Sequence, residues 1–390
     1  MNRPRMNPNL LELPIYPAGK SVKEIQQEYG LARVINMASN ESPIGPSPLA
    51  VQAYERMLTA THQYPSGLEE RFRKKLANRL HPSFDENNII IGNGSTDLLR
   101  MITQAFVFEG GNAVMSRVAS PIYRILTMTH GGSPRLAGMR IGYRQDLGAI
   151  KNLVDYDTRI VFLCSPNNPS GESIDKTEAD AFISKLPKHV VIVFDEAYHD
   201  FVDQPDQVDT INYCAAGHNV LSLRSFSAAT GLANLRVGYL VGPRKLTDYV
   251  RQTVLPFNSG DIALAAAEAS LYDTAYLEHH IKTVILGRNY LESSFRDLGL
   301  SYLPSQGNFV TIIDVPIAPE SFVEALLRRG ILVKPMGAFG LPNALRVSVG
   351  TLADNEKLVS TLDQIINQSS IVMPKPRSSL TSRFQDSTWP

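Results

Sequence analysis

Five short segments of the sequence place polar and charged side chains directly after runs of apolar residues. These segments are residues 92–97, 165–171, 194–198, 224–239 and 343–350. The apolar runs are short and bounded by turn residues, which is typical of strands covered on both faces by helices. Because ligands of open α/β sheets bind beyond the carboxyl ends of the strands, these segments are candidates for one functional site.

Two charged residues stand out because each lies at or within an apolar strand pattern. Asp195 directly ends the run before it, and a carboxylate at that depth is costly unless it meets a cation. A protonated ring nitrogen of a ligand could be that cation, and so could a buried arginine. Arg346 lies inside the apolar segment 343–350, where a guanidinium usually pairs with a carboxylate of the protein or of a ligand.

The first two segments each have two explanations. Residues 92–96 read Gly-Asn-Gly-Ser-Thr and lead into a helical pattern. Free N–H groups at the positive end of a helix suit a phosphate, but Ser95 or Thr96 could equally be an ordinary N-cap. Asn167 and Asn168 could donate amide hydrogen bonds to a ligand or simply form a turn. Neither segment is decisive alone.

The elements that must position these segments alternate between strands and helices. We expect buried strands at residues 89–91, 160–164, 190–194, 220–223 and 237–241. Helical segments separate them, which predicts a mostly parallel sheet. A short helix is expected earlier, at 22–29. After the large sheet we expect helices at 276–298, 320–329 and 355–367 and strands at 309–314, 331–334 and 344–349.

These patterns predict four regions. Residues 1–48 form an N-terminal arm that is part of a small domain, and residues 49–275 form a large α/β domain. Residues 276–368 form a smaller α+β domain, and residues 369–390 form a flexible tail rich in proline and serine.

The composition favours an ordinary globular protein. Lys and Arg together number 38, as do Asp and Glu, so a net charge of zero gives no long-range attraction for nucleic acid or an anionic membrane. The two cysteines cannot form a disulfide framework, and no stretch approaches the roughly 20 apolar residues that span a bilayer. We expect a cytoplasmic protein with neither nucleic-acid nor membrane partners.

Taken in order, the segments resemble the fold-type I pyridoxal-phosphate (PLP) aminotransferases of class I/II, and within them the histidinol-phosphate aminotransferase branch. The likeness covers nearly the whole chain. It rests above all on three motifs, which are Asn-Asn-Pro-Ser-Gly at 167–171, Phe-Asp-Glu-Ala-Tyr at 194–198 and Gly-Leu-Ala-x-Leu-Arg-x-Gly-Tyr at 231–239. The resemblance implies a mostly parallel seven-stranded sheet sandwiched by helices, a second α+β domain, PLP as the cofactor, no metal, and a homodimer in amino-acid metabolism.

The resemblance also assigns roles to individual residues. The pyridinium nitrogen would pair with Asp195, the ring would stack on Tyr123, and Tyr198 would hydrogen-bond the ring hydroxyl oxygen. The other cofactor-binding residues would be Ser95, Thr96, Asn168, Ser225, Ser227, Arg236 and, at the phosphate, Tyr64 of the partner subunit. The substrate would contact Tyr16, Asn168, Lys334 and Arg346, with Arg346 holding its carboxylate.

Two positions depart from the family pattern. The family has a lysine that forms a Schiff base with PLP directly after the Ser-Phe-Ser at 225–227, but this sequence has Ala228. The spacing to Arg236 is preserved, so the difference is not an alignment shift. Lys334 stands where the histidinol-phosphate branch usually has arginine, and lysine lacks the planar fork that grips a phosphate. The substrate is therefore left open.

Alanine can neither bond to the cofactor nor move the α-proton of a substrate. One interpretation is an inactive lysine-to-alanine variant of an aminotransferase, which traps the adduct of cofactor and substrate amine. The other is a natural non-catalytic PLP-binding protein. We favour the inactive variant, because Ala228 is the one position within the site motifs that lacks the expected residue. For the lysine-bearing parent, an aminotransferase acting on an amino acid or similar amine is the leading hypothesis, and a PLP-dependent decarboxylase or side-chain replacement enzyme is the alternative.

Overall fold

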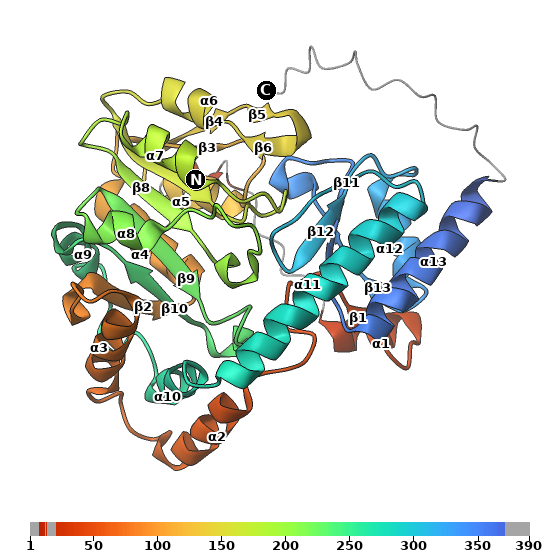
Figure 1. Cartoon of the computed structure of the whole chain (residues 1–390), viewed down its shortest axis with the longest axis horizontal. Coiled ribbons are helices and arrows are strands. Elements are labelled where there is room, and N and C mark those ends of the chain that lie inside the picture. Colours follow the sequence, from red (N-terminus) through yellow and green to blue (C-terminus); the bar gives the residue numbers. More distant parts are fainter. Residues whose placement is uncertain (1–7, 12, 14–20, 371–390) are drawn as a thin grey trace, which may run out of the picture.

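The large sheet of the computed structural model lies at the centre of the first two thirds of the chain (Figure 1). The structure describes residues 8–11, 13 and 21–370. The sheet has the order β2-β10-β9-β8-β7-β3-β4. These strands are β2 (Ile89–Asn93), β3 (Asn112–Ser116), β4 (Ser133–Ala137), β7 (Thr158–Cys164), β8 (Val191–Asp195), β9 (Val220–Ser225) and β10 (Val237–Val241). Only β10 runs antiparallel to its neighbours within this sheet, so the predicted mostly parallel sheet is confirmed.

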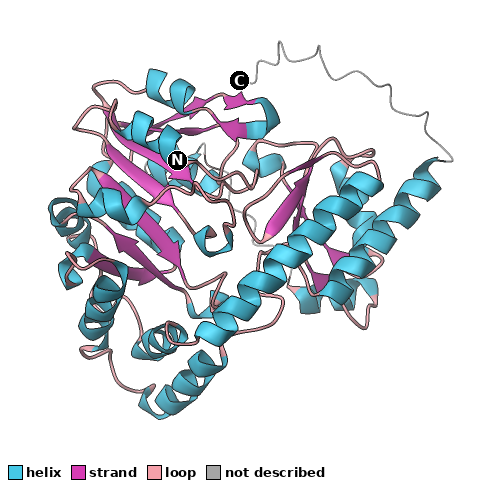
Figure 2. Ribbon diagram, viewed as in Figure 1, coloured by secondary structure: helices cyan, strands magenta, loops and turns pink. Residues whose placement is uncertain are grey.

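Helices cover both faces of the large sheet (Figure 2). Alternate residues of β8 point to opposite faces, so Ile192 joins one apolar core and Val193 joins the other. The first core is closed by α2 (Pro48–Met57), α3 (Leu68–Leu80), α6 (Leu147–Asn152), α7 (Lys176–Ile183), α8 (Thr210–Ala215) and α10 (Asp261–Ser270). The second is closed by α4 (Ser95–Phe106), α5 (Pro121–Thr129) and α9 (Arg244–Arg251).

A second, antiparallel sheet lies beside the first and has its own core. Its order is β11 (Tyr302–Leu303), β12 (Phe309–Ile312), β15 (Leu345–Ser348) and β14 (Lys334–Pro335). The helices α11 (Thr274–Asp297), α12 (Pro319–Leu327) and α13 (Leu352–Ser370) contribute residues such as Phe295, Phe322 and Leu362 to that core. Near the start of the chain, α1 (Val22–Tyr29) is followed by β1 (Ile35–Asn36), which pairs in parallel with β13 (Ile331–Leu332).

The expected strands of the large sheet are present, but the sequence did not reveal β3 or β4. β4 reads Ser-Pro-Arg-Leu-Ala at the edge of the sheet, where proline and charge are tolerated and no apolar run is needed. The hairpin β5 (Met139–Arg140) and β6 (Arg144–Gln145) was also not predicted. Among the described residues, no helix is long and apolar enough to cross a membrane.

Short 3-10 helices connect several of these elements. They are η1 (Pro8–Leu11), η2 (Leu58–Ala60), η3 (Glu86–Asn88), η4 (Ile141–Tyr143), η5 (His199–Phe201), η6 (Ala233–Leu235) and η7 (Gly337–Phe339).

Candidate functional site

Asp195 ends β8 between two parallel neighbours, and its side chain is buried. The hydroxyl of Tyr123 donates to its Oδ2 at 2.7 Å, and the backbone N–H of Ala197 donates to its Oδ1 at 3.3 Å. Burial raises the pKa of Asp195, while the Tyr123 hydrogen bond opposes that rise. In the part of the chain that the structure describes, no lysine, arginine or histidine forms an ion pair with Asp195. The carboxylate is therefore a suitable acceptor for a cationic ligand.

Tyr123 on α5 is only 1% exposed, and its ring stacks on Phe162 of β7. The ring centroids are 4.9 Å apart and the planes differ by 8°. Burial and the charge of Asp195 both raise the pKa of Tyr123, so the phenol stays protonated and acts as the donor to Asp195. Sequence reasoning assigned Tyr123 only to ring stacking and missed this second contact.

Arg346 connects the second sheet to the end of β7 in the large sheet. Its Nη1 donates to Oδ1 of Asn168 at 2.7 Å, and its Nη2 donates to the carbonyl of Ala38 at 2.7 Å. Its guanidinium carbon lies 5.3 Å from the ring centroid of Phe309 and 5.9 Å from that of Phe339. The structure therefore brings Asn168 and Arg346 together, as one site requires.

Lys334 lies directly opposite Arg346 in the β14–β15 pairing. Its Nζ is 5.9 Å from the ring centroid of Phe339. Burial lowers the pKa of Lys334, and the nearby charge of Arg346 lowers it further. Two cations on adjacent strands favour an anionic group between or beside them.

Tyr198 follows β8 by a few residues and has a raised pKa because it is buried. Its hydroxyl oxygen accepts a hydrogen bond from Nδ2 of Asn40 at 3.0 Å, and its ring packs edge-on against Phe309. Asn40 was not among the predicted site residues. It follows β1 and joins a residue 158 positions away, so no local pattern in the sequence could reveal the contact.

A second group of predicted residues gathers at the start of α4. Gly94 occupies the N-cap at φ 77°, and no side chain caps the helix, whose first residues are Ser95 and Thr96. A Cβ at Gly94 would overlap Nη2 of Arg236, which places that guanidinium against the helix end. Nη1 of Arg236 donates to the carbonyl of Ala233 at 2.9 Å and to Oγ of Ser227 at 3.4 Å.

Serine hydroxyls complete a phosphate cup, which comprises the start of α4, Arg236, Ser225 and Ser227. Ser225 ends β9, and its Oγ accepts from the backbone N–H of Ser227 at 3.0 Å, so the two serines lie close together at this strand end. The positive end of α4, the guanidinium and these hydroxyls together form a suitable set of donors for a phosphate group.

Glu196 and Arg224 form a buried ion pair beneath the site. Oε2 of Glu196 accepts hydrogen bonds from Thr210 at 2.6 Å, from Ser222 at 2.6 Å and from Nε of Arg224 at 3.0 Å. Burial alone would raise the pKa of Glu196, but Arg224 and the other donors hold it below its usual value. The pair ties the end of β8, which carries Asp195, to the end of β9. Neither Glu196 nor Arg224 was among the predicted site residues.

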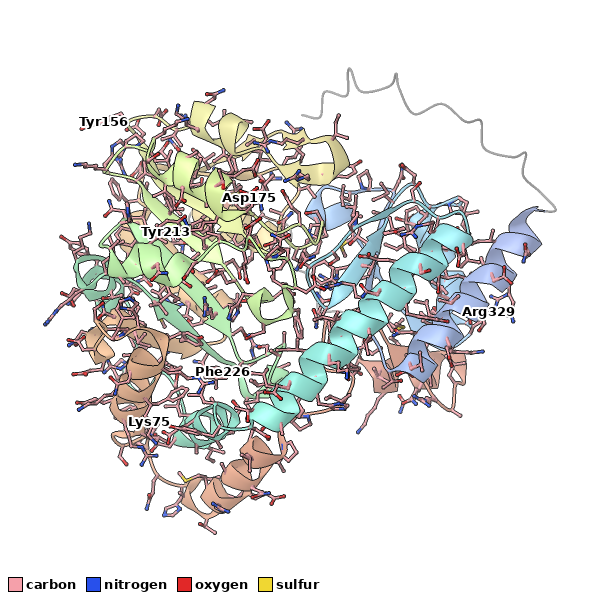
Figure 3. All side chains as sticks on the ribbon, viewed as in Figure 1. Lys75, Tyr156, Asp175, Tyr213, Phe226 and Arg329 are labelled. Atoms are coloured by element: carbon pink, nitrogen blue, oxygen red, sulfur yellow. The ribbon has the colours of Figure 1, made fainter. Side chains whose placement is uncertain are left out.

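Ala228 is buried in an apolar cluster with Phe201, Ala229 and Val284. It belongs to the loop after β9, which begins near Phe226 and lies close to the N-terminal end of α11 (Figure 3). Within this loop the N–H of Gly231 donates to the carbonyl of Ala228 at 3.2 Å. Residue 228 is therefore held in place but offers only a methyl group.

The remaining predicted residues are not brought into this group. Tyr64 is 78% exposed and stacks on Phe257, with ring centroids 4.7 Å apart. Tyr16 lies outside the described residues.

Known proteins share both the sequence and the fold of this chain. The family model "Aminotransferase class I and II" matches residues 32–362. Histidinol-phosphate aminotransferase 2 of Methylococcus capsulatus is 39% identical over 364 residues, covering 92% of this chain and 97% of that protein. Histidinol-phosphate aminotransferase of Geobacillus sp. (strain WCH70) is 36% identical over 363 residues, covering 92% and 98%.

Solved structures agree with these sequence relationships. The crystal structure of histidinol-phosphate aminotransferase from Sinorhizobium meliloti in complex with pyridoxal-5'-phosphate has a TM-score of 0.85 and 27% identity, covering 94% of this chain and 99% of that one. Aspartate aminotransferase from Thermus thermophilus, at 20% identity and a TM-score of 0.80, shares the fold. The chain belongs to the class I and II aminotransferase family.

Proposed function

We propose that this chain binds pyridoxal 5'-phosphate, with the pyridine nitrogen at Asp195 and the phosphate at the cup formed by Gly94, Ser95 and Arg236. The observation that carries this proposal is the buried carboxylate of Asp195, which has no cationic partner among the described residues. The S. meliloti relative binds the same cofactor. When bound, PLP supplies an electron sink for negative charge at the α-carbon of an amine substrate.

The chain's own side chains would hold the ring from several sides. Asp195 keeps the ring nitrogen protonated, and Tyr198 with Asn168 would hydrogen-bond the ring hydroxyl oxygen. Tyr123 would contact the ring face while its hydroxyl orients Asp195. Thr96, Ser225 and Ser227 would complete the phosphate site around Arg236.

The proposed activity of the lysine-bearing parent is amino-group transfer between an amine substrate and a 2-oxo acid. The substrate named by the relatives is histidinol phosphate, which carries a phosphate group. Lys334 and Arg346 support an anionic substrate group because they place two cations on neighbouring strands. Arg346 would bind the substrate carboxylate or phosphate, and Lys334 would add charge beside it.

Ala228 leaves this chain without the side-chain amine that the proposed reaction needs. The family pattern has a lysine at this position, and a buried methyl group cannot take a proton from a substrate carbon. We infer that Ala228 replaces the lysine of an active parent, and that the present chain binds cofactor and amine without turnover.

We also propose a homodimer in which Tyr64 of the partner subunit reaches the phosphate. Support comes from an exposed aromatic pair, since Tyr64 stacks on Phe257 and the two side chains are 78% and 61% exposed. Such surface is typical of a protein–protein interface. Sedimentation of the native chain as a monomer at micromolar concentration would contradict the dimer.

The Ala228→Lys protein tests the function directly. We expect it to transfer the amino group of histidinol phosphate to a 2-oxo acid, while the native chain and Ala228→Met, a long side chain without an amine, do not. Release of carbon dioxide from an amino-acid substrate without amine transfer would instead support the decarboxylase. PLP binding without turnover in Ala228→Lys would support a natural non-catalytic protein.

A further inference from the structure

Asn40 lies in a hydrogen-bond network between the second sheet and Tyr198. Its backbone N–H donates to Oγ of Ser348 at 2.8 Å, and Oγ of Ser348 lies 2.8 Å from Oδ1 of Asn40. Its Nδ2 lies 3.0 Å from the hydroxyl of Tyr198, and its carbonyl accepts from Nδ2 of Asn308 at 2.9 Å. Asn40 is 5% exposed, so these partners replace water around it.

This network fixes the orientation of the Asn40 amide. Oγ of Ser348 accepts from the backbone N–H of Asn40 and donates its own proton to Oδ1, and a flipped amide would leave that proton without an acceptor among the described residues. Oδ1 of Asn40 therefore faces Ser348, and Nδ2 faces Tyr198 as a donor.

The orientation of the Asn40 amide determines what the Tyr198 hydroxyl can do with its proton. The hydroxyl oxygen accepts from Asn40, and no acceptor for the hydroxyl proton is present among the described residues. Tyr198 is buried and has a raised pKa, so it keeps that proton at neutral pH. The proton is thus available for a hydrogen bond to a ligand.

We propose that Asn40 is a positioning residue that directs the Tyr198 hydroxyl proton toward the ring oxygen of the cofactor. The inference rests on the proposed binding of PLP. Asn40 suits the role because its backbone has φ 55°, a left-handed conformation that Asn, Asp and Gly adopt more readily than other residues. Ser348 lies two positions after Arg346 on β15, so the strand that carries the proposed substrate-binding arginine also sets the Tyr198 donor.

Two substitutions at this left-handed position distinguish positioning from a general structural role. Asn40→Gly removes the amide and leaves the Tyr198 proton free to reach the cofactor. Asn40→Asp keeps the shape but presents only acceptors at neutral pH, so the Tyr198 hydroxyl turns to the new carboxylate. A general structural role predicts the opposite ranking, with the larger effect for Asn40→Gly.

Equilibrium dialysis with PLP, without any turnover assay, measures the effect. We expect Asn40→Asp to raise the Kd at least about tenfold over Asn40→Gly, and Asn40→Gly to stay within about threefold of the native chain. Ser348→Ala releases the amide orientation without touching Asn40 and should weaken binding about threefold. If Asn40→Asp does not fold, a native Kd for Ser348→Ala overturns the inference.

The Tyr198→Phe background supplies the control. There the difference between Asn40→Asp and Asn40→Gly should largely disappear, because no hydroxyl proton remains to be redirected. An equal Kd for the two Asn40 variants, or a difference that persists unchanged in Tyr198→Phe, overturns the inference. If the native chain itself retains no PLP on dialysis, the proposed function fails instead.

Discussion

The Glu196→Gln substitution would test whether the buried ion pair under the site holds the ends of β8 and β9 together. Glutamine preserves the volume but removes the charge opposite Arg224, whose Nε lies 3.0 Å from the carboxylate. It also weakens the hydrogen bonds from Thr210 and Ser222. Breaking a buried pair by removing one partner costs about 3–5 kcal/mol, because the remaining charge is left uncompensated.

The free energy of unfolding that Glu196→Gln loses should decrease as the pH falls. The pKa of Glu196 in the folded protein is below its ordinary value of 4.5, so the carboxylate stabilises the native state above that pH. This contribution disappears as the pH falls through the folded pKa. The difference in free energy of unfolding between the native chain and Glu196→Gln should therefore be largest near neutral pH and smaller at about pH 4.

Urea unfolding followed by circular dichroism measures both quantities. Asp248→Asn is a matched control, since it breaks the exposed pair with Arg244 and should cost less than about 1 kcal/mol. A loss for Glu196→Gln no larger than that of the control, or one that does not change between the two pH values, would refute the reasoning.

Two further substitutions probe the cofactor site itself. Tyr123→Phe should keep PLP binding within about threefold, since the ring remains, but lower the free energy of unfolding by about 1–3 kcal/mol at pH 8. Because burial raises the pKa of Asp195, the folded protein takes up a proton there as the pH falls, so this loss should shrink toward about pH 5; an equal loss at both pH values contradicts the assignment. Gly94→Ala places a Cβ against Arg236 at φ 77° and should weaken PLP binding at least about tenfold in dialysis, whereas unchanged binding would show that the phosphate lies elsewhere.

The order of elements could be predicted from the sequence because the central strands are continuous apolar runs. β8 and β10, for example, are entirely buried and were expected within one or two residues of their observed ends. β4 was not predicted because an edge strand does not require a continuous apolar run. The local pattern thus identifies buried elements and misses those whose positions depend on their neighbours.

In the site, too, residues with a local sequence signal were identified, whereas their contacts with distant residues were not. The motifs identified Asp195, Asn168 and Arg346 because they end a strand, follow one in a loop and lie within one, respectively. The partners of these residues could not be predicted, since Tyr123 and Asp195 are 72 positions apart and Arg346 and Asn168 are 178 apart. The Tyr123–Asp195 contact forms when α5 packs on the large sheet, and the Arg346–Asn168 contact forms when the second sheet packs beside it.

The most direct test of the account is covalent labelling at residue 228. The Ala228→Lys protein, incubated with PLP and reduced with borohydride, should carry the pyridoxyl group on the new lysine, as located by peptide mass mapping. The native chain, treated in the same way, should carry no label on that peptide. Labelling of other lysines alone, or none at all, would contradict the claim that Ala228 occupies the cofactor-bonding position of a PLP site.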